Sequence, residues 1–125
     1  GGGDAAGALD LLALAQSDAQ AAKAPLLEAI AASDRARALV SLGRTDEALA
    51  ALENSTALAP DRAEGWLLKA TLLRRLERMA EAQSAIESAA TLAPTNPEIA
   101  REAGVIAVLA GRDDAARKSW QSVLA

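Results

Sequence analysis

The chain lacks several residue types on which common catalytic and metal sites depend. Its 125 residues include no Cys, His, Tyr or Phe, and the only aromatic residues are Trp66 and Trp120. Without Cys there is neither a disulfide nor a thiolate metal site, and the redox compartment cannot be read from the sequence. Candidates for a general acid, base or nucleophile are reduced to Asp, Glu, Lys, Ser and Thr. We therefore expect no enzyme activity, no cofactor and no metal site in this chain.

Long apolar runs and an excess of positive charge are also missing. The longest nearly unbroken apolar run extends only from Gly104 to Gly111, whereas a membrane-spanning helix needs about 18 to 20 residues. The formal net charge is −4. Because phosphate binding needs a positive field, we expect no nucleic-acid partner. Because the apolar run is short, we expect no membrane insertion by this segment. Ten Arg against three Lys, with abundant Ala, are typical of a GC-rich bacterial genome. We therefore expect a soluble segment in the bacterial cytoplasm or periplasm, and the sequence does not show which of the two.

What the chain does have is an internal repeat rich in Ala and Leu. The segment Gly43–Pro60, GRTDEALAALENSTALAP, recurs as Glu77–Pro94, ERMAEAQSAIESAATLAP. Ala48, Ala82 and Ala116 follow one another at the same spacing of 34 residues. Ala and Leu are good helix formers, and a fixed period of this length indicates helical hairpins that bury their apolar faces by stacking. The sequence therefore predicts an all-α fold.

Residues at fixed places in this period resemble those of a tetratricopeptide repeat. The family's Trp, small, bulky, Ala, bulky, Ala and Pro positions are occupied by Trp66, Ala70, Leu73, Ala82, Ile86, Ala89 and Pro94. One copy earlier they are occupied by Ala32, Ala36, Leu39, Ala48, Leu52, Ser55 and Pro60, and one copy later by Ala100, Gly104, Ala107, Ala116, Trp120 and Val123. The resemblance covers roughly Ala29 to Ala125. It implies a right-handed α-solenoid of stacked antiparallel helix pairs, with about seven or eight helices.

We expect one structural domain, in which helix-breaking residues separate several parts. We expect a flexible N-terminus at residues 1–3, a degenerate N-terminal hairpin at 4–32, and three repeats at 33–125, spanning about 29–62, 63–96 and 97–125. The first helix is predicted over residues 4–16 and a second segment over about 17–31. Pro25 either kinks that segment or occupies the first turn of a shorter helix. Ser33 or Asp34 is expected to begin the next helix.

Glycines and caps set the later helix boundaries. Gly43 stands where a left-handed C-cap is expected, but the equivalent residue one period later is Glu77. A non-Gly residue in that conformation costs about 1 kcal/mol, so we expect a different turn geometry there. Asn96 is predicted to cap a helix with Pro97 at its first position. Gly111 should end that helix, and a last one should run from Asp113 to about Leu124. Both Trp residues are interpreted as packing residues rather than ligand cages.

The resemblance also implies a concave groove lined by the first helix of each hairpin. Carried over onto this sequence, the groove positions include Val40, Arg75 and six candidate peptide-binding residues: Arg37, Leu67, Thr71, Arg74, Arg101 and Val105. The three arginines can present cations to an acidic or carboxylate-bearing peptide. The alternative is that they are solvated and balance neighbouring acids and helix ends.

Some members of the family clamp the C-terminal carboxylate of heat-shock chaperones with Lys and Asn at set groove positions. Here those positions hold Ser33, Arg37, Leu68, Glu98 and Glu102, so the clamp is not reproduced. A chaperone-tail receptor is therefore not implied by the resemblance.

The leading functional hypothesis is a non-catalytic protein-interaction module that binds a peptide or short helix of a partner protein in its concave groove. One alternative is a structural module that self-associates through exposed solenoid ends. Another is an accessory domain of a larger enzyme or assembly factor, since the chain begins without Met and ends inside an amphipathic pattern. The sequence identifies neither the partner nor the oligomeric state.

Overall fold

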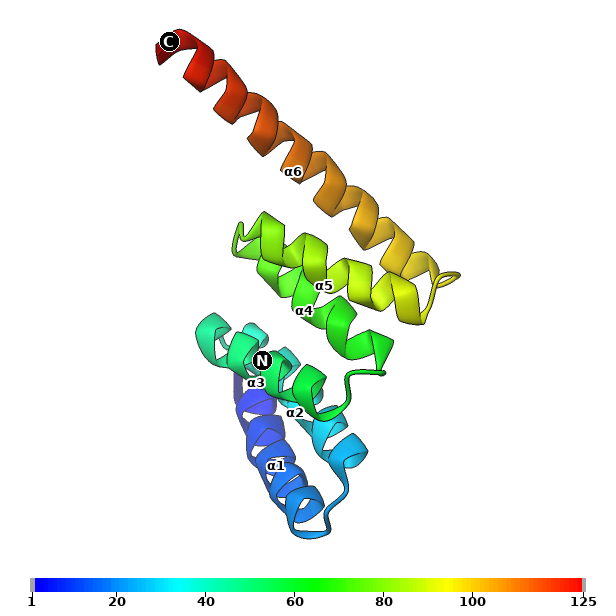
Figure 1. Cartoon of the computed structure of the whole chain (residues 1–125). Coiled ribbons are helices and arrows are strands. Elements are labelled where there is room, and N and C mark those ends of the chain that lie inside the picture. The colour runs from blue at the N-terminus through cyan, green and yellow to red at the C-terminus, as the bar shows by residue number, and fades with distance from the viewer. Residues whose placement is uncertain (1, 125) are drawn as a thin grey trace.

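The computed structural model describes the backbone of residues 2–124 and the side chains of residues 4–121, and over this range the chain forms six helices. They are α1 (Gly2–Ala21), α2 (Pro25–Ser41), α3 (Thr45–Leu58), α4 (Ala63–Arg75), α5 (Met79–Leu92) and α6 (Pro97–Leu124). Figure 1 shows α1–α3 grouped at one end, the α4–α5 pair stacked on them, and α6 running across that pair and beyond it. The predicted all-α solenoid is confirmed, with six helices where about seven or eight were expected.

The N-terminal hairpin is made of longer helices than the sequence predicted. Gly1 lies outside the described residues, and α1 begins at Gly2. Instead of breaking near Ser17, α1 continues to Ala21. Pro25 occupies the first position of α2, where its missing N–H costs no intrahelical hydrogen bond. Of the two alternatives for this proline, the helix start is therefore confirmed.

The predicted helix start at Ser33 or Asp34 is wrong, because α2 passes through both residues without a break. The Ser33 hydroxyl donates to the carbonyl oxygen of Ile30 at 2.9 Å, one turn back in the same helix. It also accepts a hydrogen bond of 2.9 Å from Nη1 of Arg62, in the loop before α4. Ser33 is thus a buried helical residue whose hydroxyl joins α2 to the next repeat.

Three tight turns share one backbone geometry. Lys23, Gly43 and Glu77 follow α1, α2 and α4, and have φ angles of 55°, 75° and 61°. After Gly43, the amide of Arg44 donates to the carbonyl oxygen of Leu39 at 2.9 Å, and the other two turns close with the same 2.9 Å bond. This is the Schellman arrangement, which satisfies carbonyls at a helix end. The left-handed Gly43 is confirmed, and the different geometry expected at Glu77 is wrong.

An arginine follows the left-handed residue in two of these turns and pairs with a glutamate in the next helix. Nε and Nη2 of Arg44 donate to the Glu47 carboxylate at 2.5 and 2.8 Å, and Arg78 repeats this with Glu81 at 2.8 and 2.7 Å. The side-chain hydrogen bond from Arg44 lowers the pKa of the Glu47 carboxyl. These exposed pairs mark the first turns of α3 and α5.

The core is built around small residues at the repeat positions. Ala48, Ala70, Ala82 and Ala89 are each 0% exposed, so the helix surfaces that carry them are in full contact with neighbours. Around them pack larger side chains from α2 to the first half of α6, including Leu39, Leu52, Leu73, Ile86, Ile99 and Ile106. Alanines let helix axes approach closely, and the larger residues fill the spaces beside the close contacts. The core is continuous from hairpin to hairpin.

The two tryptophans have different surroundings. Trp66, on α4, packs against the core, and its Nε1 donates to the carbonyl oxygen of Pro60 at 2.8 Å. Nζ of Lys69 lies 5.3 Å from the centre of the Trp66 ring. Trp120, on α6, is 65% exposed. The packing role predicted from the sequence is confirmed for Trp66, and for Trp120 it is wrong in this conformation of the chain.

The last helix starts as predicted but does not end as predicted. Oδ1 of Asn96 accepts the backbone N–H groups of Glu98 and Ile99 at 2.9 and 3.2 Å, which confirms the cap. The predicted end at Gly111 is wrong, since α6 continues to Leu124. A glycine inside a helix costs only about 1 kcal/mol, and the alanines around it favour helix. Figure 1 shows this second half of α6 leaving the body of the protein.

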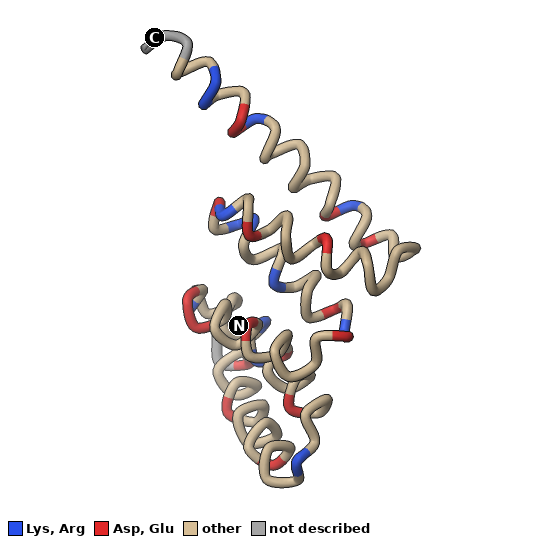
Figure 2. Tube along the Cα trace, in the orientation of Figure 1, with Lys and Arg blue, Asp and Glu red and all other residues tan. Residues whose placement is uncertain are grey.

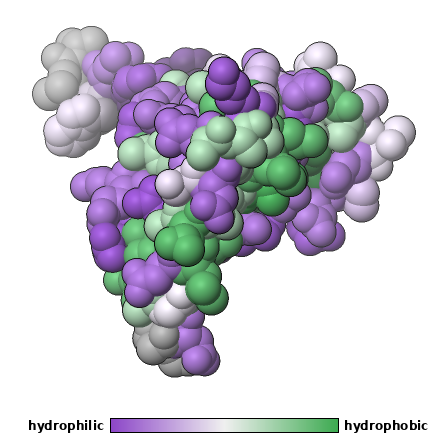
Figure 3. Space-filling model, turned by 90° about the horizontal axis from the view of Figure 1, so that it is seen from below, coloured by the Kyte–Doolittle hydropathy of each residue, from purple (hydrophilic) through white to green (hydrophobic). Residues whose placement is uncertain are grey.

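Apolar side chains are exposed at the opposite end of the solenoid. Leu11 and Leu14 on α1 and Leu26 and Leu27 on α2 are each more than half exposed. Figure 3 shows apolar side chains gathered on the face seen from below. Even so, none of the described helices is both long enough and apolar enough to cross a membrane.

Replacing Glu77 by glycine should stabilise the protein. Glu77 has a positive φ of 61°, where a side chain is strained and glycine is not. We expect Glu77→Gly to raise the free energy of unfolding by about 1 kcal/mol in urea titrations. The matched control, Gly43→Ala, places a side chain in the equivalent turn and should lower it by a similar amount. A loss of stability in Glu77→Gly would contradict the steric argument.

Trp66 should contribute by packing more than by its hydrogen bond. Trp66→Phe keeps most of the ring and loses only the bond to the Pro60 carbonyl, so thermal or urea unfolding should show a loss of about 1 kcal/mol. Trp66→Ala also removes the ring from the core and should cost about 3 kcal/mol. Equal losses in the two variants would assign the contribution to the hydrogen bond instead.

Candidate functional site

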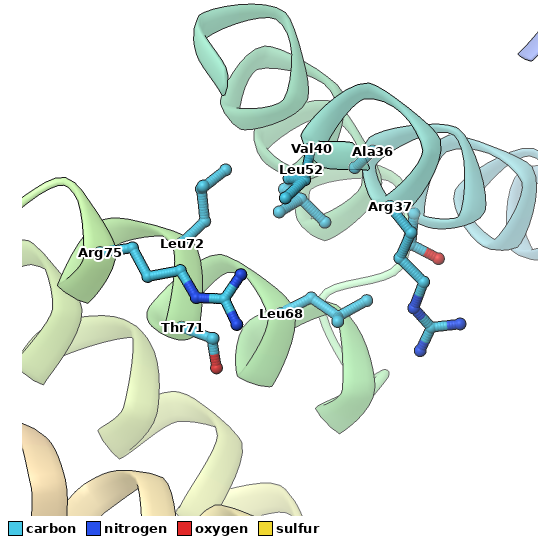
Figure 4. A pocket seen from close by; sticks show the side chains of 9 residues that line it. Ala36, Arg37, Val40, Leu52, Leu68, Thr71, Leu72 and Arg75 are labelled. Atoms are coloured by element: carbon cyan, nitrogen blue, oxygen red, sulfur yellow. The ribbon is translucent and has the colours of Figure 1, made fainter. Parts of the chain in front are cut away.

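An apolar cleft opens between the α2–α3 hairpin and the α4–α5 hairpin that stacks on it. It has a volume of about 180 Å³ and lies between α2, α3 and α4. Figure 4 shows Val40 and Leu52 on one side of the cleft, and Leu68 and Leu72 on the other. The remaining lining residues are Ser33, Ala36, Arg37, Thr71 and Arg75. The arginines stand at opposite ends of an apolar floor, an arrangement suited to an aliphatic side chain next to a polar or charged group.

A second depression continues from the first along α4 toward α6. Arg37 and Leu68 line both, and Glu64, Leu67 and the start of α6 complete the second, whose volume is about 400 Å³. A third, shallower depression lies on α6 alone. Its lining consists of Arg101, Gly104, Val105, Val108, Leu109 and Arg112. The helices α2, α4 and α6 thus carry a row of three depressions, and two further depressions lie beside α5, around Gln83 and around Ser84.

The six candidate residues fall into three groups in the structure. Arg37, Leu67 and Thr71 lie around the two depressions beside α4. Arg101 and Val105 lie together on α6. Arg74 lines none of these depressions and is engaged elsewhere, in an ion pair.

Arg74 joins α4 to α6. Its Nε donates to both carboxylate oxygens of Glu102, at 2.9 and 3.1 Å. The Glu102 side chain is 9% exposed and that of Arg74 is 24% exposed, so the pair is largely removed from water. A buried carboxylate needs such a partner, because an unpaired buried charge is costly. For Arg74, the alternative interpretation of an arginine that balances a neighbouring acid therefore describes the contact seen here.

Arg37 is also paired with acids, but at the surface. Its Nη2 donates to Oε1 of Glu64 at 2.5 Å and its Nη1 to Oδ1 of Asp34 at 3.3 Å, and about half of the side chain is exposed. Among the described residues, Arg75 and Arg101 form neither a side-chain hydrogen bond nor an ion pair. The same holds for Arg112, so the cations near the depressions that are available to a ligand are Arg75, Arg101 and Arg112.

Sequence reasoning placed Val40 in the groove but did not identify Leu52, Leu68 and Leu72 as part of the first cleft. Leu68 is half-buried and Leu72 is buried, and both lie beside predicted groove positions. The signal for two of them is local, because Leu68 and Leu72 directly follow the predicted groove residues Leu67 and Thr71. The contribution of Leu52 from α3 depends on how two hairpins stack, and no local pattern contains that information.

The described residues do not bring together three or more His, Cys, Asp or Glu side chains that can hold a metal ion. Figure 2 shows Lys and Arg interspersed with Asp and Glu along α2–α6, over the range that the structure describes. The candidate site is therefore defined by shape and apolar surface, with a few local charges.

Comparison with known proteins agrees with this architecture. The sequence model of the tetratricopeptide repeat matches residues 33–97 and, in a second alignment, residues 67–125. The chain belongs to the tetratricopeptide repeat family. This family is generally a non-catalytic protein-interaction fold. A comparison with curated protein sequences found no match.

Solved structures with the same fold include three tetratricopeptide repeat domains. The Arabidopsis OM64 domain is 17% identical with a TM-score of 0.60, over 79% of this chain and 93% of its own. The first such domain of Spaghetti (RPAP3), bound to the HSP90 peptide SRMEEVD, is 15% identical with a TM-score of 0.64, over 82% of this chain and 95% of its own. The second domain of human RPAP3, in complex with the HSP70 peptide SGPTIEEVD, is 16% identical with a TM-score of 0.60, over 78% of this chain and 97% of its own. At these identities the likeness is one of fold.

The pair formed by Arg74 and Glu102 should be a stabilising contact between repeats. Glu102→Ala leaves the guanidinium without its partner in a site that is largely shielded from water, and should lower the free energy of unfolding by about 2 kcal/mol. Glu81→Ala removes the partner of Arg78 at an exposed site and is the matched control, with a much smaller expected loss. Urea titrations of the two variants give the comparison. Equal losses would show that the ion pair between α4 and α6 contributes no more to the free energy of unfolding than an exposed ion pair does.

Proposed function

We propose that this tetratricopeptide repeat chain is a non-catalytic module that binds a peptide or short helix of a partner protein in its concave groove. The observation that carries the proposal is the apolar cleft of about 180 Å³ between the α2–α3 and α4–α5 hairpins, which has a buried to half-buried aliphatic lining and an arginine at each end. Clefts of this kind recognise an apolar side chain, while the surrounding polar groups orient the rest of the ligand.

The proposed ligand is an extended segment with one aliphatic side chain and an acidic residue nearby. The aliphatic side chain enters between Leu68 and Val40, and the main chain passes over Thr71. Leu67 and Val105 provide further apolar contact along the row of depressions. The acidic group pairs with Arg75 or Arg101, whose guanidinium groups are not committed to a carboxylate among the described residues.

Arg37 and Arg74 have other roles in this proposal. Arg37 forms the rim shared by the first two depressions and is oriented by Glu64. Arg74 keeps α6 attached to α4 through Glu102, and so holds the two walls of the groove at a constant spacing. An acidic ligand has to compete with Glu64 for Arg37, which favours contact with Arg75 and Arg101.

The peptides bound by the RPAP3 domains end in EEVD, and we expect such a peptide not to bind here. Glu98 and Glu102 stand where the carboxylate clamp of the family has Lys and Asn, and Glu102 already accepts from Arg74. Isothermal titration of SRMEEVD into the chain should show no binding even at millimolar peptide. Saturable binding would contradict this expectation and support a chaperone-tail receptor.

Capture of partners from a native lysate tests the groove itself. The variant Leu67→Glu/Thr71→Glu adds two negative charges at the depressions beside α4. The control Gln83→Glu/Ser84→Glu adds the same charge on α5, where both residues are exposed. A partner held by the parent and the control but lost by the groove variant supports the proposal, and its peptide should then bind the groove variant at least about tenfold more weakly in titrations.

Circular dichroism and urea unfolding must first show that both double variants are folded. Equal capture by the two would exclude the groove as the binding surface. Loss of the partner from the α5 control alone would move the site to the opposite face of the α4–α5 hairpin.

A further inference from the structure

The third repeat is open in this structure, whereas the two before it are closed hairpins. In the closed hairpins α2 turns into α3 and α4 turns into α5, and the facing residues are buried. In the third repeat, α6 runs straight through the position of the turn. Its 28 residues divide at Gly111 into two equal halves that correspond to the first and second helices of a hairpin.

The first half of α6 exposes the face that a second helix would cover. In α4, the repeat positions of Ala70 and Leu73 are at most 1% exposed. One period later they are occupied by Gly104 and Ala107, and both are exposed. A Cβ added at Gly104 would meet nothing within 4 Å. No helix of the described chain covers this face, and Ala107 lines an open depression between α6 and the start of α5, together with Met79 and Gln83.

The second half of α6 exposes the complementary face. The positions of Ala82 and Ile86 in α5, both buried, are repeated by Ala116 and Trp120. Every side chain described from Gly111 onward is exposed, including these two. One chain thus carries both surfaces of a hairpin contact, and its straight helix keeps them from meeting each other.

The sequence of the missing turn is nevertheless present. Gly111-Arg112 repeats Gly43-Arg44, the pair that ends α2 and starts α3. Arg44 forms the turn with a non-helical ψ of 66°. In α6 neither residue forms a turn, and the two halves continue as one helix. A closed hairpin and a straight helix are therefore alternative conformations of the same segment, as in proteins that exchange elements between copies.

We propose that the straight α6 is the form that pairs with a second copy of this chain. Two α6 helices lie antiparallel, and the second half of each covers Gly104 and Ala107 of the other. The repeat spacing sets Ala107 opposite Ala116 of the second copy, so the two-fold axis passes close to Arg112. Each copy completes the third hairpin of the other, and both exposed faces are buried in one self-complementary interface.

A proline introduced at residue 113 would distinguish the straight form of α6 from the closed hairpin. Proline inside a straight helix clashes with the preceding turn, but it is favoured at the first position of a helix. Residue 113 is equivalent to Thr45, the first residue of α3. The chain already has such a turn, because Pro25 begins α2 after the left-handed Lys23. Asp113→Pro is therefore compatible with a closed hairpin and incompatible with the straight α6.

Light scattering after size-exclusion chromatography gives the mass of each form over a range of concentrations. The parent chain is expected at the mass of two chains, with dissociation on dilution, and Asp113→Pro at the mass of one. Gly111→Ala disfavours the left-handed turn and should shift the equilibrium further toward the dimer. A parent that stays at one chain at every concentration, or an Asp113→Pro that stays dimeric, would overturn the proposal.

Cross-linking gives a second readout that does not depend on the proline variant. The parent has no Cys, so Ala107→Cys and Ala116→Cys are each single-thiol proteins. With a short bismaleimide, a mixture of the two should form a covalent dimer in high yield. Each variant alone should not, because identical positions in the paired helices lie about 14 Å apart along the axis. Equal cross-linking in the mixture and in either variant alone, or none in any of them, would refute the antiparallel pairing.

Discussion

The fold depends on the close approach of paired helices at small residues that recur with the repeat. Ala48, Ala70 and Ala82 have no exposed surface, and larger residues such as Leu39 and Leu73 surround them. A larger side chain at those places would separate the helices and open the core to water. Helices of this length are marginal alone, so each hairpin is stable because it contacts the next. The tight turns and the arginine–glutamate pairs that follow two of them direct the chain into this contact but do not replace it.

Much of the fold could be predicted from the sequence where local chemistry and the repeat agree. Gly43 and Asn96 have the conformation and hydrogen bonds that their residue types favour. Prediction failed where a tertiary contact outweighed a local preference. Ser33 can cap a helix, but its hydroxyl bonds to Ile30 and Arg62 inside one. Glu77 adopts a left-handed conformation because the turn around it is closed by two backbone hydrogen bonds.

The candidate site was predictable to the level of a surface. The period indicated on which helices the proposed groove residues lie, since residue positions on a helix determine its faces. It did not indicate which arginines are free. The bonds of Arg74 to Glu102 and of Arg37 to Glu64 join residues that are 28 and 27 positions apart. Those contacts depend on how one hairpin is rotated on the next, and that rotation is a property of packing rather than of any local motif.

The first half of α6 has three faces, and they serve different contacts. Ile99, Glu102 and Ile106 are buried against the preceding repeat. Gly104 lines the same depression as Arg101 and Val105, and it lies only about 60° around the helix from Arg101. A second helix on the Gly104 and Ala107 face, whether from the same chain or from another copy, therefore packs along the edge of that depression. That second helix would also contact a side of α6 that is now exposed to solvent. The proposed association thus borders one wall of the proposed groove, so we expect dimer formation and ligand binding at Arg101 and Val105 to affect each other.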